Sequence, residues 1–450
     1  MPVRFAPVLL AASLAAPAVL GGASRPDILL ITVDTLRADH LGAYGYFRET
    51  SPAIDALAAE SLLFERCYTP LAYTLPAHMS LLTATFPYEH GVLANFRKEG
   101  VYFDRAAGAA SFAEFARRAG YTTAGFVSAA VLHRDTGIAA GFDVFYDVPD
   151  QVRAADTIER VLTFLDAEPS RPLFLWVHLY DPHRPYVAPP PFDRRFTTSA
   201  RLEREAAKRK VSAGKVKAQN GELRRFEGLP AINAYDGEVA YADSQLGRLF
   251  EALRREGLWD DLVVVFTSDH GEALGEHGRD GHGHIYIEHL HVPLLVRVPG
   301  VAPRRVKTPV SLVDALPTAL ARIEGNPFAR FLARVSGRDA LGGKPRTVVI
   351  SQRAQSSGDV PRSLAATGRY WAYLKQTGRE ELFRLLDDPF ELHDLSRAAP
   401  AQLRRMRSYV EAEIAAQEER ARALSKAGWR KGKRVLPEKL ERLHALGYGD

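Results

Sequence analysis

An apolar, β-branched run ends abruptly in an acidic residue and a histidine at Val263-Val264-Val265-Phe266-Thr267-Ser268-Asp269-His270. A run of this kind is typical of a buried parallel strand. Ligands of open α/β sheets bind just beyond the carboxyl ends of the strands, so Asp269 and His270 are expected to face a site. Histidines cluster in the same stretch: of 14 in the chain, six lie between residues 270 and 291, namely His270, His277, His282, His284, His289 and His291. The alternative is a polar loop whose histidines only cap and solvate.

A second apolar run, at residues 28–33, also ends in a carboxylate, Asp34. Two such strands predict one shared site, in which Asp34, Asp269 and His270 bind a divalent cation. Aspartate oxygens suit Ca, Mg or Mn, and the added imidazole favours Zn or Mn. Three ligands leave room for a nucleophile and a substrate oxygen. The candidate nucleophile is Thr74, at an expected helix start where the helix dipole favours both an alkoxide and an anion; the alternative is a simple helix cap.

Strands that alternate with helices are expected to position these residues. We expect helices after Ser51 (the cap, with Pro52 first), after Thr74 and at 111–119, 158–165 and 238–255, and strands at 28–33, 121–127, 173–179 and from 263. This order predicts an α/β fold with a mostly parallel sheet covered on both faces. Beyond about residue 340 the pattern changes to short strands at 347–350, 370–374 and 382–385, followed by a helix at 402–424.

Charge is concentrated in one segment. Residues 194–225 contain eleven Lys or Arg against three Glu, an excess of eight, whereas the whole chain has a net charge of +5. The remainder is close to neutral, which gives little support for nucleic-acid binding. The segment has no strand pattern; it predicts a solvated, partly helical insertion or, alternatively, a lid or an arm for anionic substrates.

The first 23 residues have the pattern of a secretory signal: Arg4, an apolar stretch from Phe5 to Leu20, and the small residues Gly21-Gly22-Ala23. The mature chain is expected to begin near Ser24 and to be periplasmic or secreted, with no transmembrane span; an uncleaved anchor is the alternative. Cys67 is the single cysteine, which excludes an intrachain disulfide.

Several separated motifs resemble the sulfatase family of the alkaline phosphatase superfamily. They lie, in the family's order, at 28–39, 51–64, 74–83, 121–128, 181–186 and 235–299, with a further similarity at 381–395. The resemblance implies a doubly wound, alkaline phosphatase-like α/β catalytic domain at 24–340, a smaller C-terminal antiparallel α+β domain at 341–450, and hydrolysis of sulfate or phosphate esters at a metal.

The resemblance also implies residue roles. Asp34, Asp269 and His270 match the family's metal positions. Thr74 matches its nucleophile and is also expected as a metal ligand. His78 stands where an arginine usually follows the nucleophile, His183 matches a substrate-contacting histidine, and His282 matches a lysine or histidine that binds the ester. His178 and His284 are expected as further substrate-binding residues.

Three departures from the family's pattern matter. Sulfatases proper have a cysteine or serine that is oxidised to formylglycine; oxidation of the secondary alcohol of Thr74 would give a ketone, so no formylglycine is expected. Thr35 replaces a second metal-binding aspartate, and Phe126 and Ser128 replace a lysine and a histidine that hold the sulfate. These differences are more typical of the superfamily's phosphodiesterases and of its phosphoethanolamine or phosphoglycerol transferases.

The sequence therefore predicts an exported hydrolase in which one divalent ion (Ca, Mn, Zn or Mg) activates Thr74 against a sulfate or phosphate ester of a small molecule, glycan or lipid head group. The alternatives are a phosphodiesterase or phospho-head-group transferase of the same superfamily, and a catalytically silent binder of anionic glycans.

Overall fold

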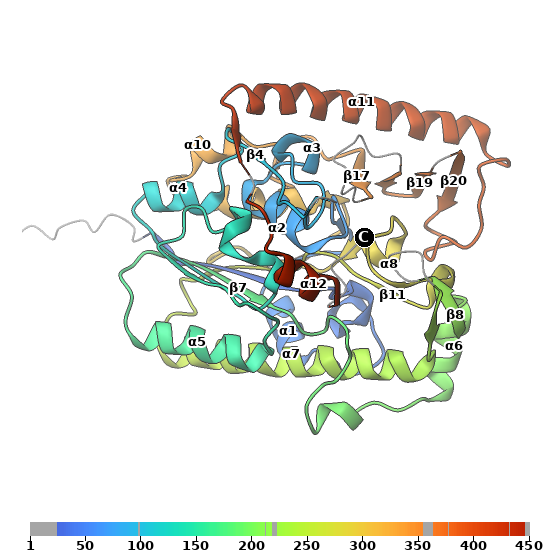
Figure 1. The fold of residues 1–450 in the computed structure, drawn as a ribbon, viewed down its shortest axis with the longest axis horizontal. Helices are drawn as coiled ribbons and strands as arrows, with labels where there is room; N and C mark the ends of the chain where they lie inside the picture. The colour runs from blue at the N-terminus through green and yellow to red at the C-terminus, as the bar shows by residue number, and fades with distance from the viewer. Residues whose placement is uncertain are drawn as a thin grey trace, which may run out of the picture.

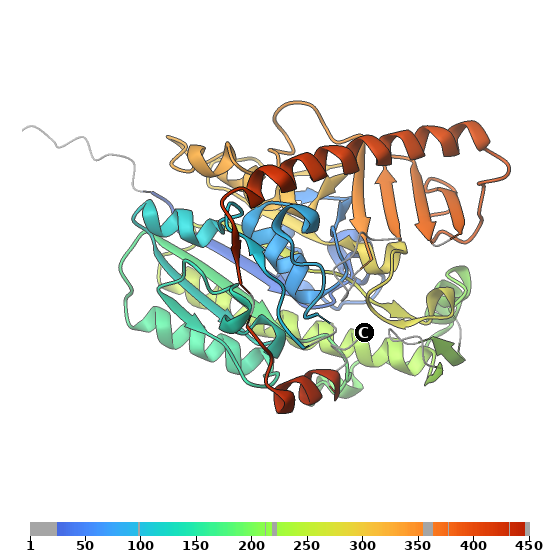
Figure 2. The same cartoon turned by 45° about the horizontal axis from the view of Figure 1, so that its top comes forward.

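A computed structural model describes residues 25–97, 100–211, 213–217, 223–353, 363–376, 378–431 and 433–445. The signal segment expected at residues 1–23 lies outside this range. Figure 1 shows a large central sheet with helices above and below it, and Figure 2 shows a second sheet at one end, next to a long C-terminal helix.

The large sheet has eight strands in the order β15-β2-β14-β10-β1-β7-β5-β6. β1, β5, β6, β7 and β10 are parallel to one another, whereas β14 is antiparallel to both β10 and β2. The strands are β1 (Ile28–Val33), β2 (Leu62–Phe64), β5 (Thr122–Val127), β6 (Val144–Tyr146), β7 (Leu173–Leu179), β10 (Val263–Ser268), β14 (Leu294–Arg297) and β15 (Arg304–Val306). The predicted mostly parallel α/β sheet is confirmed.

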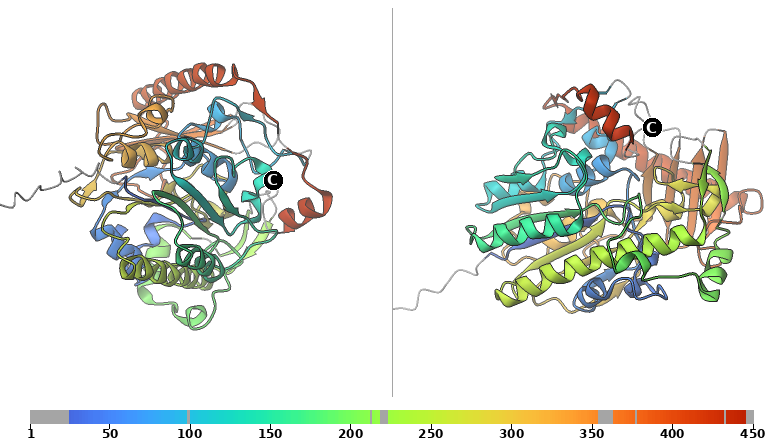
Figure 3. Two further views of the ribbon diagram at one scale, coloured as in Figure 1. Left: turned by 90° about the vertical axis from the view of Figure 1, so that its left-hand side faces the viewer. Right: turned by 60° about the horizontal axis from the view of Figure 1, so that its bottom comes forward.

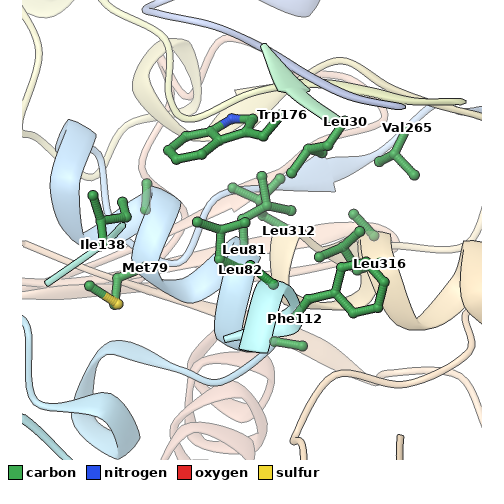
Figure 4. Packing of buried hydrophobic residues seen from close by; sticks show 14 of the residues in the cluster. Leu30, Met79, Leu81, Leu82, Phe112, Ile138, Trp176, Val265, Leu312 and Leu316 are labelled. Carbon is green, nitrogen blue, oxygen red and sulfur yellow. The ribbon is translucent and has the colours of Figure 1, made fainter. Parts of the chain in front are cut away.

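Each face of this sheet is covered by its own set of helices. Side chains of β1 alternate between the two faces: Ile28 and Leu30 join one core, and Leu29 and Ile31 join the other. The first core, part of which is drawn in Figure 4, contains residues of α2 (Thr74–Thr83), α4 (Phe112–Arg118) and α9 (Ala315–Leu320). The second contains residues of α1 (Pro52–Ala59), α5 (Ala154–Asp166) and α7 (Leu229–Arg255). In Figure 3, α5 and α7 run along the outside of the second face. Burial on both faces explains why the strands are continuously apolar.

A four-stranded antiparallel sheet follows, made of β17 (Val348–Gln352), β18 (Leu364–Gly368), β19 (Trp371–Gln376) and β20 (Arg379–Arg384). One of its faces packs on α11 (Pro400–Ser425), through Met406 and Val410. The other face packs on residues 285–290, which follow the expected site histidines. The sequence missed β18, because Leu-Ala-Ala-Thr-Gly is short, rich in small residues and without alternation.

The basic segment contains α6 (Ala200–Lys208) and a hairpin of β8 (Gly214–Lys217) and β9 (Leu223–Phe226), so the expectation of no strand was wrong. After α11 the chain returns to the large domain, where β21 (Trp429–Arg430) pairs with β4 (Arg105–Ala106). The remaining elements are β3 (Cys67–Tyr68), β11 (Ala273–Leu274), β12 (Asp280–Gly281), β13 (His291–Val292), β16 (Val310–Ser311), α3 (Pro87–His90), α8 (Ile287–Leu290), α10 (Ala329–Leu332) and α12 (Pro437–Ala445). Among the described helices, none combines the length and apolar character that crossing a bilayer requires.

Candidate active site

Two neighbouring parallel strands bring the two predicted acidic ligands together. Val33 at the end of β1 pairs in register with Ser268 at the end of β10, so Asp34 and Asp269 each follow the same rung of the sheet. Together with His270 they form a group whose ligand atoms all lie within 4.8 Å of one another. All three side chains are fully buried. The structure therefore assembles the cluster that the two strand ends predicted.

The chemistry of this cluster fits a divalent cation. Both carboxylate oxygens of Asp34 and Oδ2 of Asp269 are buried and have no hydrogen-bond partner in the described part of the chain. Burial raises the pKa of Asp34 well above its usual value, and the neighbouring charges of Asp269 and Glu272 raise it further. Burial lowers the pKa of His270 to about 3, which keeps its imidazole neutral and able to bind a metal. Buried, unpartnered anions of this kind are stabilised by a metal ion.

Thr74 is the first residue of α2 and faces the cluster. Its Oγ1 lies 3.5 Å from Nε2 of His270. The residue that caps the helix is Tyr73, so Thr74 does not act as the helix cap. The first N–H groups of a helix have no partner within the helix. At α2, the N–H of Leu75 donates to Asn95 Oδ1 at 3.0 Å. This leaves the Thr74 hydroxyl at the positive end of the helix, directed towards the candidate metal ligands.

Asn95 is a candidate site residue that the sequence did not indicate. Its side chain is buried, with 1% of its surface exposed, and its Nδ2 has no acceptor within the described residues. The Asn95 oxygen accepts a hydrogen bond from the first turn of α2, which leaves its NH2 group without a partner among the described residues. This NH2 group is available to donate a hydrogen bond to an oxygen atom of a bound ester. No motif marks it, because only the fold brings residue 95 next to residue 75.

His78 supports the cluster from one turn further along α2. Its Nδ1–H donates to the carbonyl oxygen of Thr74 at 2.7 Å, and its Nε2 lies 3.0 Å from the hydroxyl of Thr32. That hydroxyl accepts a hydrogen bond from Trp176 Nε1, so its own proton is directed at His78. His78 Nδ1 is 3.7 Å from Oδ2 of Asp269. With both nitrogens engaged, His78 is placed to orient Thr74 and Asp269.

His183 and His282 form a pair next to His270. Their Nε2 atoms are 3.4 Å apart, and the rings of His282 and His270 are separated by 4.5 Å between centroids. His183 Nδ1 lies 2.7 Å from the carbonyl oxygen of Arg184, which can only accept, so this nitrogen carries a proton. Burial lowers the pKa of His183 to about 3 and the pKa of His282 well below its usual value. Both imidazoles are therefore neutral near pH 7.

The other expected substrate residues are distributed around this centre. His178 is fully buried on β7, with Nε2 3.7 Å from Oδ2 of Asp34. The Ser128 hydroxyl donates to the His178 carbonyl at 2.7 Å, whereas Phe126 packs in the apolar core below the sheet. His284 lies two residues after His282, and its Nε2 is 3.2 Å from Nη1 of Arg279.

A charged group near His183 was also missed by the sequence analysis. Both terminal nitrogens of Arg184 bind Asp280, and its Nε lies 4.0 Å from the buried carboxylate of Glu272. Burial raises the pKa of Glu272 to about 7, and the Arg184 guanidinium opposes that shift. Glu272 follows His270 by two residues, and this proximity was the one signal available in the sequence.

Comparison with known proteins finds relatives of this sequence and of its fold. A profile of the sulfatase family matches residues 26–325. The choline-sulfatase of Rhizobium meliloti is 27% identical over 438 residues, covering 83% of this chain and 82% of that protein. A putative sulfatase from Bacteroides fragilis superimposes with a TM-score of 0.71 at 19% identity, covering 92% and 99% of the two chains. The phosphonate monoester hydrolase of Agrobacterium radiobacter superimposes with a TM-score of 0.65 at 23% identity, covering 88% and 96%.

Proposed function

This chain belongs to the sulfatase family and is a hydrolase of ester bonds, and we propose that it cleaves sulfate or phosphate esters through a covalent intermediate on Thr74. One observation carries this proposal: the Thr74 hydroxyl at the start of α2 lies 3.5 Å from His270, inside the cluster of candidate metal ligands. A hydroxyl beside a helix N-terminus and a metal site has the position of an activated nucleophile.

Asp34, Asp269 and His270 would hold one divalent cation. When bound, such an ion neutralises the two carboxylates, lowers the pKa of a hydroxyl next to it and offsets negative charge on the oxygens of the ester. The protein supplies the rest of the site. The N-terminus of α2 presents its dipole to the same oxygens, and Asn95 has a free N–H group beside it.

In the first step, the Thr74 oxygen forms a bond to sulfur or phosphorus as the bond to the alcohol oxygen breaks. The proton of the Thr74 hydroxyl passes to an unprotonated ring nitrogen of the neutral pair of His183 and His282, and the resulting imidazolium gives a proton to the leaving alcohol oxygen as its bond breaks. Burial keeps both rings neutral before the ester binds. An anionic ester next to them raises their pKa, which makes the imidazolium form accessible during the reaction. In the second step, water attacks the covalent ester and gives one proton to the same imidazole pair, and the imidazolium returns that proton to the threonine oxygen as the bond to Thr74 breaks.

The way in which the covalent ester on Thr74 is released determines whether sulfate or phosphate esters are the better substrates. A formylglycine hydrate has a second hydroxyl that can expel sulfate, and Thr74 has none. Its ester must be released by direct attack of water, a route that suits phosphoryl groups. The names of the compared proteins support both chemistries, since one is a choline-sulfatase and another a phosphonate monoester hydrolase. We therefore infer that phosphate or phosphonate esters are substrates at least as good as sulfates.

The test is a turnover screen of an aryl sulfate, a phosphate monoester, a phosphodiester and a phosphonate ester, with wild type and Thr74→Ala. We expect the variant to lose at least a thousandfold in kcat while it keeps its metal content by elemental analysis. The matched control is Thr83→Ala, at the other end of α2, where the hydroxyl bonds to the Met79 carbonyl. A stalled wild-type intermediate should add the mass of the transferred group to a peptide that contains Thr74. Wild-type turnover of every ester by Thr74→Ala would place the nucleophile elsewhere.

A further inference from the structure

A half-buried arginine that forms no ion pair with any described residue lies next to the proposed site. Arg279 precedes β12, and its Nε is buried with no hydrogen-bond partner in the described chain. Its guanidinium makes one hydrogen bond to a side chain, to Nε2 of His284 at 3.2 Å, and lies over the ring of Tyr286 at 5.8 Å from the centroid. Removal of a guanidinium from water without an anion is unfavourable, so this position is suited to a ligand that supplies the charge.

The nearby carboxylates are already engaged with other cations. Glu288 lies 3.0 Å from Nδ1 of His277, and Glu381 lies 2.7 Å from a guanidinium nitrogen of Arg379. No acidic side chain of the described residues comes within 4.0 Å of Arg279. Burial lowers the pKa of Arg279, and the charge of Arg353 lowers it further, so the two arginines lie close enough to repel each other. Glu288 and Glu381 attract the Arg279 guanidinium at longer range, but neither forms an ion pair with it.

His284 completes this group as a neutral donor. Its side chain is 5% exposed, and burial with the charges of Arg279 and Arg353 lowers its pKa to about 3. Because Nε2 accepts the hydrogen bond from Arg279, the single proton of the neutral ring is on Nδ1. The group thus offers two guanidinium groups and one imidazole N–H and no acceptor that would repel an anion.

The chain places this group beside the reacting centre. His284 is two residues from His282, and two extended residues span at most about 7 Å. His282 lies 5.4 Å from the ring of Tyr73, the residue before Thr74. Arg353 directly follows Gln352, which forms a bridge with Leu71, three residues before Thr74. Arg279 thus lies in the loop after β10, and the exposed Arg353, whose charge acts on both Arg279 and His284, follows the end of β17.

We propose that Arg279, His284 and Arg353 form a second anion-binding subsite that holds a carboxylate, sulfate or phosphate group of the same substrate molecule whose ester is cleaved at Thr74. This inference rests on the proposed function and specifies its substrate class. The preferred substrate is an ester whose alcohol portion carries a second negative charge, separated from the scissile group by about one aromatic ring. Esters with a neutral alcohol portion would lack this contact.

The test compares phenyl esters with their 3- and 4-carboxyphenyl counterparts, both as sulfates and as phosphates. In the wild type, we expect kcat/KM to be at least tenfold higher for one of the carboxyphenyl esters. In Arg279→Gln and Arg353→Gln this preference should fall towards one, through KM, while kcat/KM for the plain phenyl ester stays within about twofold. Arg369→Gln is the matched control, since its exposed guanidinium lies over Tyr370 at 5.1 Å from the ring centroid.

Two outcomes overturn the subsite: a wild type that does not prefer the charged esters, or variants that lose activity equally on charged and plain esters. A binding measurement separates this failure from failure of the proposed function. Calorimetry with benzene-1,3-disulfonate and with benzenesulfonate needs no turnover, and tighter binding of the disulfonate that disappears in Arg279→Gln supports the subsite even if no ester is hydrolysed. Equal binding of the two sulfonates by the wild type rejects it.

Discussion

Replacement of Asp34 by asparagine should stabilise the metal-free protein. Asp34 and Asp269 are both buried, and their ligand atoms lie within 4.8 Å of each other. Two unit charges at that separation repel by about 3.5 kcal/mol at an effective dielectric constant near 20. Protonation of Asp34 can relieve this repulsion, but at pH 7 it costs up to about 4 kcal/mol relative to the ordinary pKa of 3.8. Either way, the metal-free site destabilises the fold by roughly 3 to 4 kcal/mol, and a neutral amide removes that cost.

The expected change in melting temperature follows from the size of the chain. With an unfolding entropy of about 2.1 cal/mol/K per residue, 450 residues give about 0.9 kcal/mol/K, so the Tm of Asp34→Asn should rise by about 3 to 4 °C in EDTA. Addition of Ca, Mn, Mg or Zn at a hundred times its Kd should raise the wild type by about 3 °C through linkage and leave the variant unchanged. Differential scanning calorimetry of both proteins, with and without each metal, measures these shifts.

Asp243→Asn is the matched control. Asp243 is also buried, but its two oxygens accept hydrogen bonds from the N–H groups of Ala53 and Ile54 at 3.1 and 2.8 Å. Its replacement should lower the Tm with and without metal and leave the metal-induced rise intact. If Asp34→Asn melts below the wild type in EDTA, or keeps the full rise on addition of metal, the carboxylate cluster is not a metal site.

Three further predictions address other parts of the chain. Asn95→Ala should lose about 1 kcal/mol of stability with the bond to Leu75 and at least tenfold in kcat; full kcat in Asn95→Ala would remove the amide from the mechanism. Burial lowers the pKa of His90 to about 3. Below pH 6.5 the unfolded chain therefore binds a proton at this histidine that the folded chain does not bind, which favours unfolding. Stability should therefore fall by about 1.3 kcal/mol per such histidine between pH 7.5 and 5.5, and urea titrations of His90→Gln should show a correspondingly smaller fall; an unchanged slope contradicts this. We also propose that residues 1–23 are removed on export, which intact-mass measurement of periplasmic protein should show as a chain that starts near Ser24; the full-length mass in the membrane fraction would support an anchor instead.

The metal cluster was predictable from sequence because it depends on one regular feature. Parallel strands end at the same edge of a sheet. Two acidic residues that each directly follow an apolar strand are therefore expected to lie together at that edge. The register of Val33 with Ser268 then fixes the two carboxylates side by side. Thr74 was found for a similar reason, because a helix start has a recognisable local pattern.

The residues that were missed depend on contacts without a periodic signal. Asn95 meets Leu75 across a loop, and Arg279 meets His284 because the hairpin of β11 and β12 turns back on itself. Neither contact follows from spacing, since the loop conformations are set by tertiary packing. The hairpin of β8 and β9 was missed because strand patterns there are obscured by lysines and arginines, which are solvated on both faces of a two-stranded ribbon.

The small antiparallel sheet packs against the segment that carries His282 and His284. The ring of His277 stacks on Tyr286 at 3.9 Å, and its Nε2 bonds to the Glu391 carbonyl at 3.2 Å. The carboxylate of Glu391 accepts from the N–H of Ile287 at 2.9 Å. The two bonds to Glu391 come from the chain that follows β20, and they hold both ends of the segment that carries His282 and His284. The small sheet contributes no residue to the group of Asp34, Asp269 and His270, yet its apolar contact with residues 285–290 helps to position the neighbouring His282.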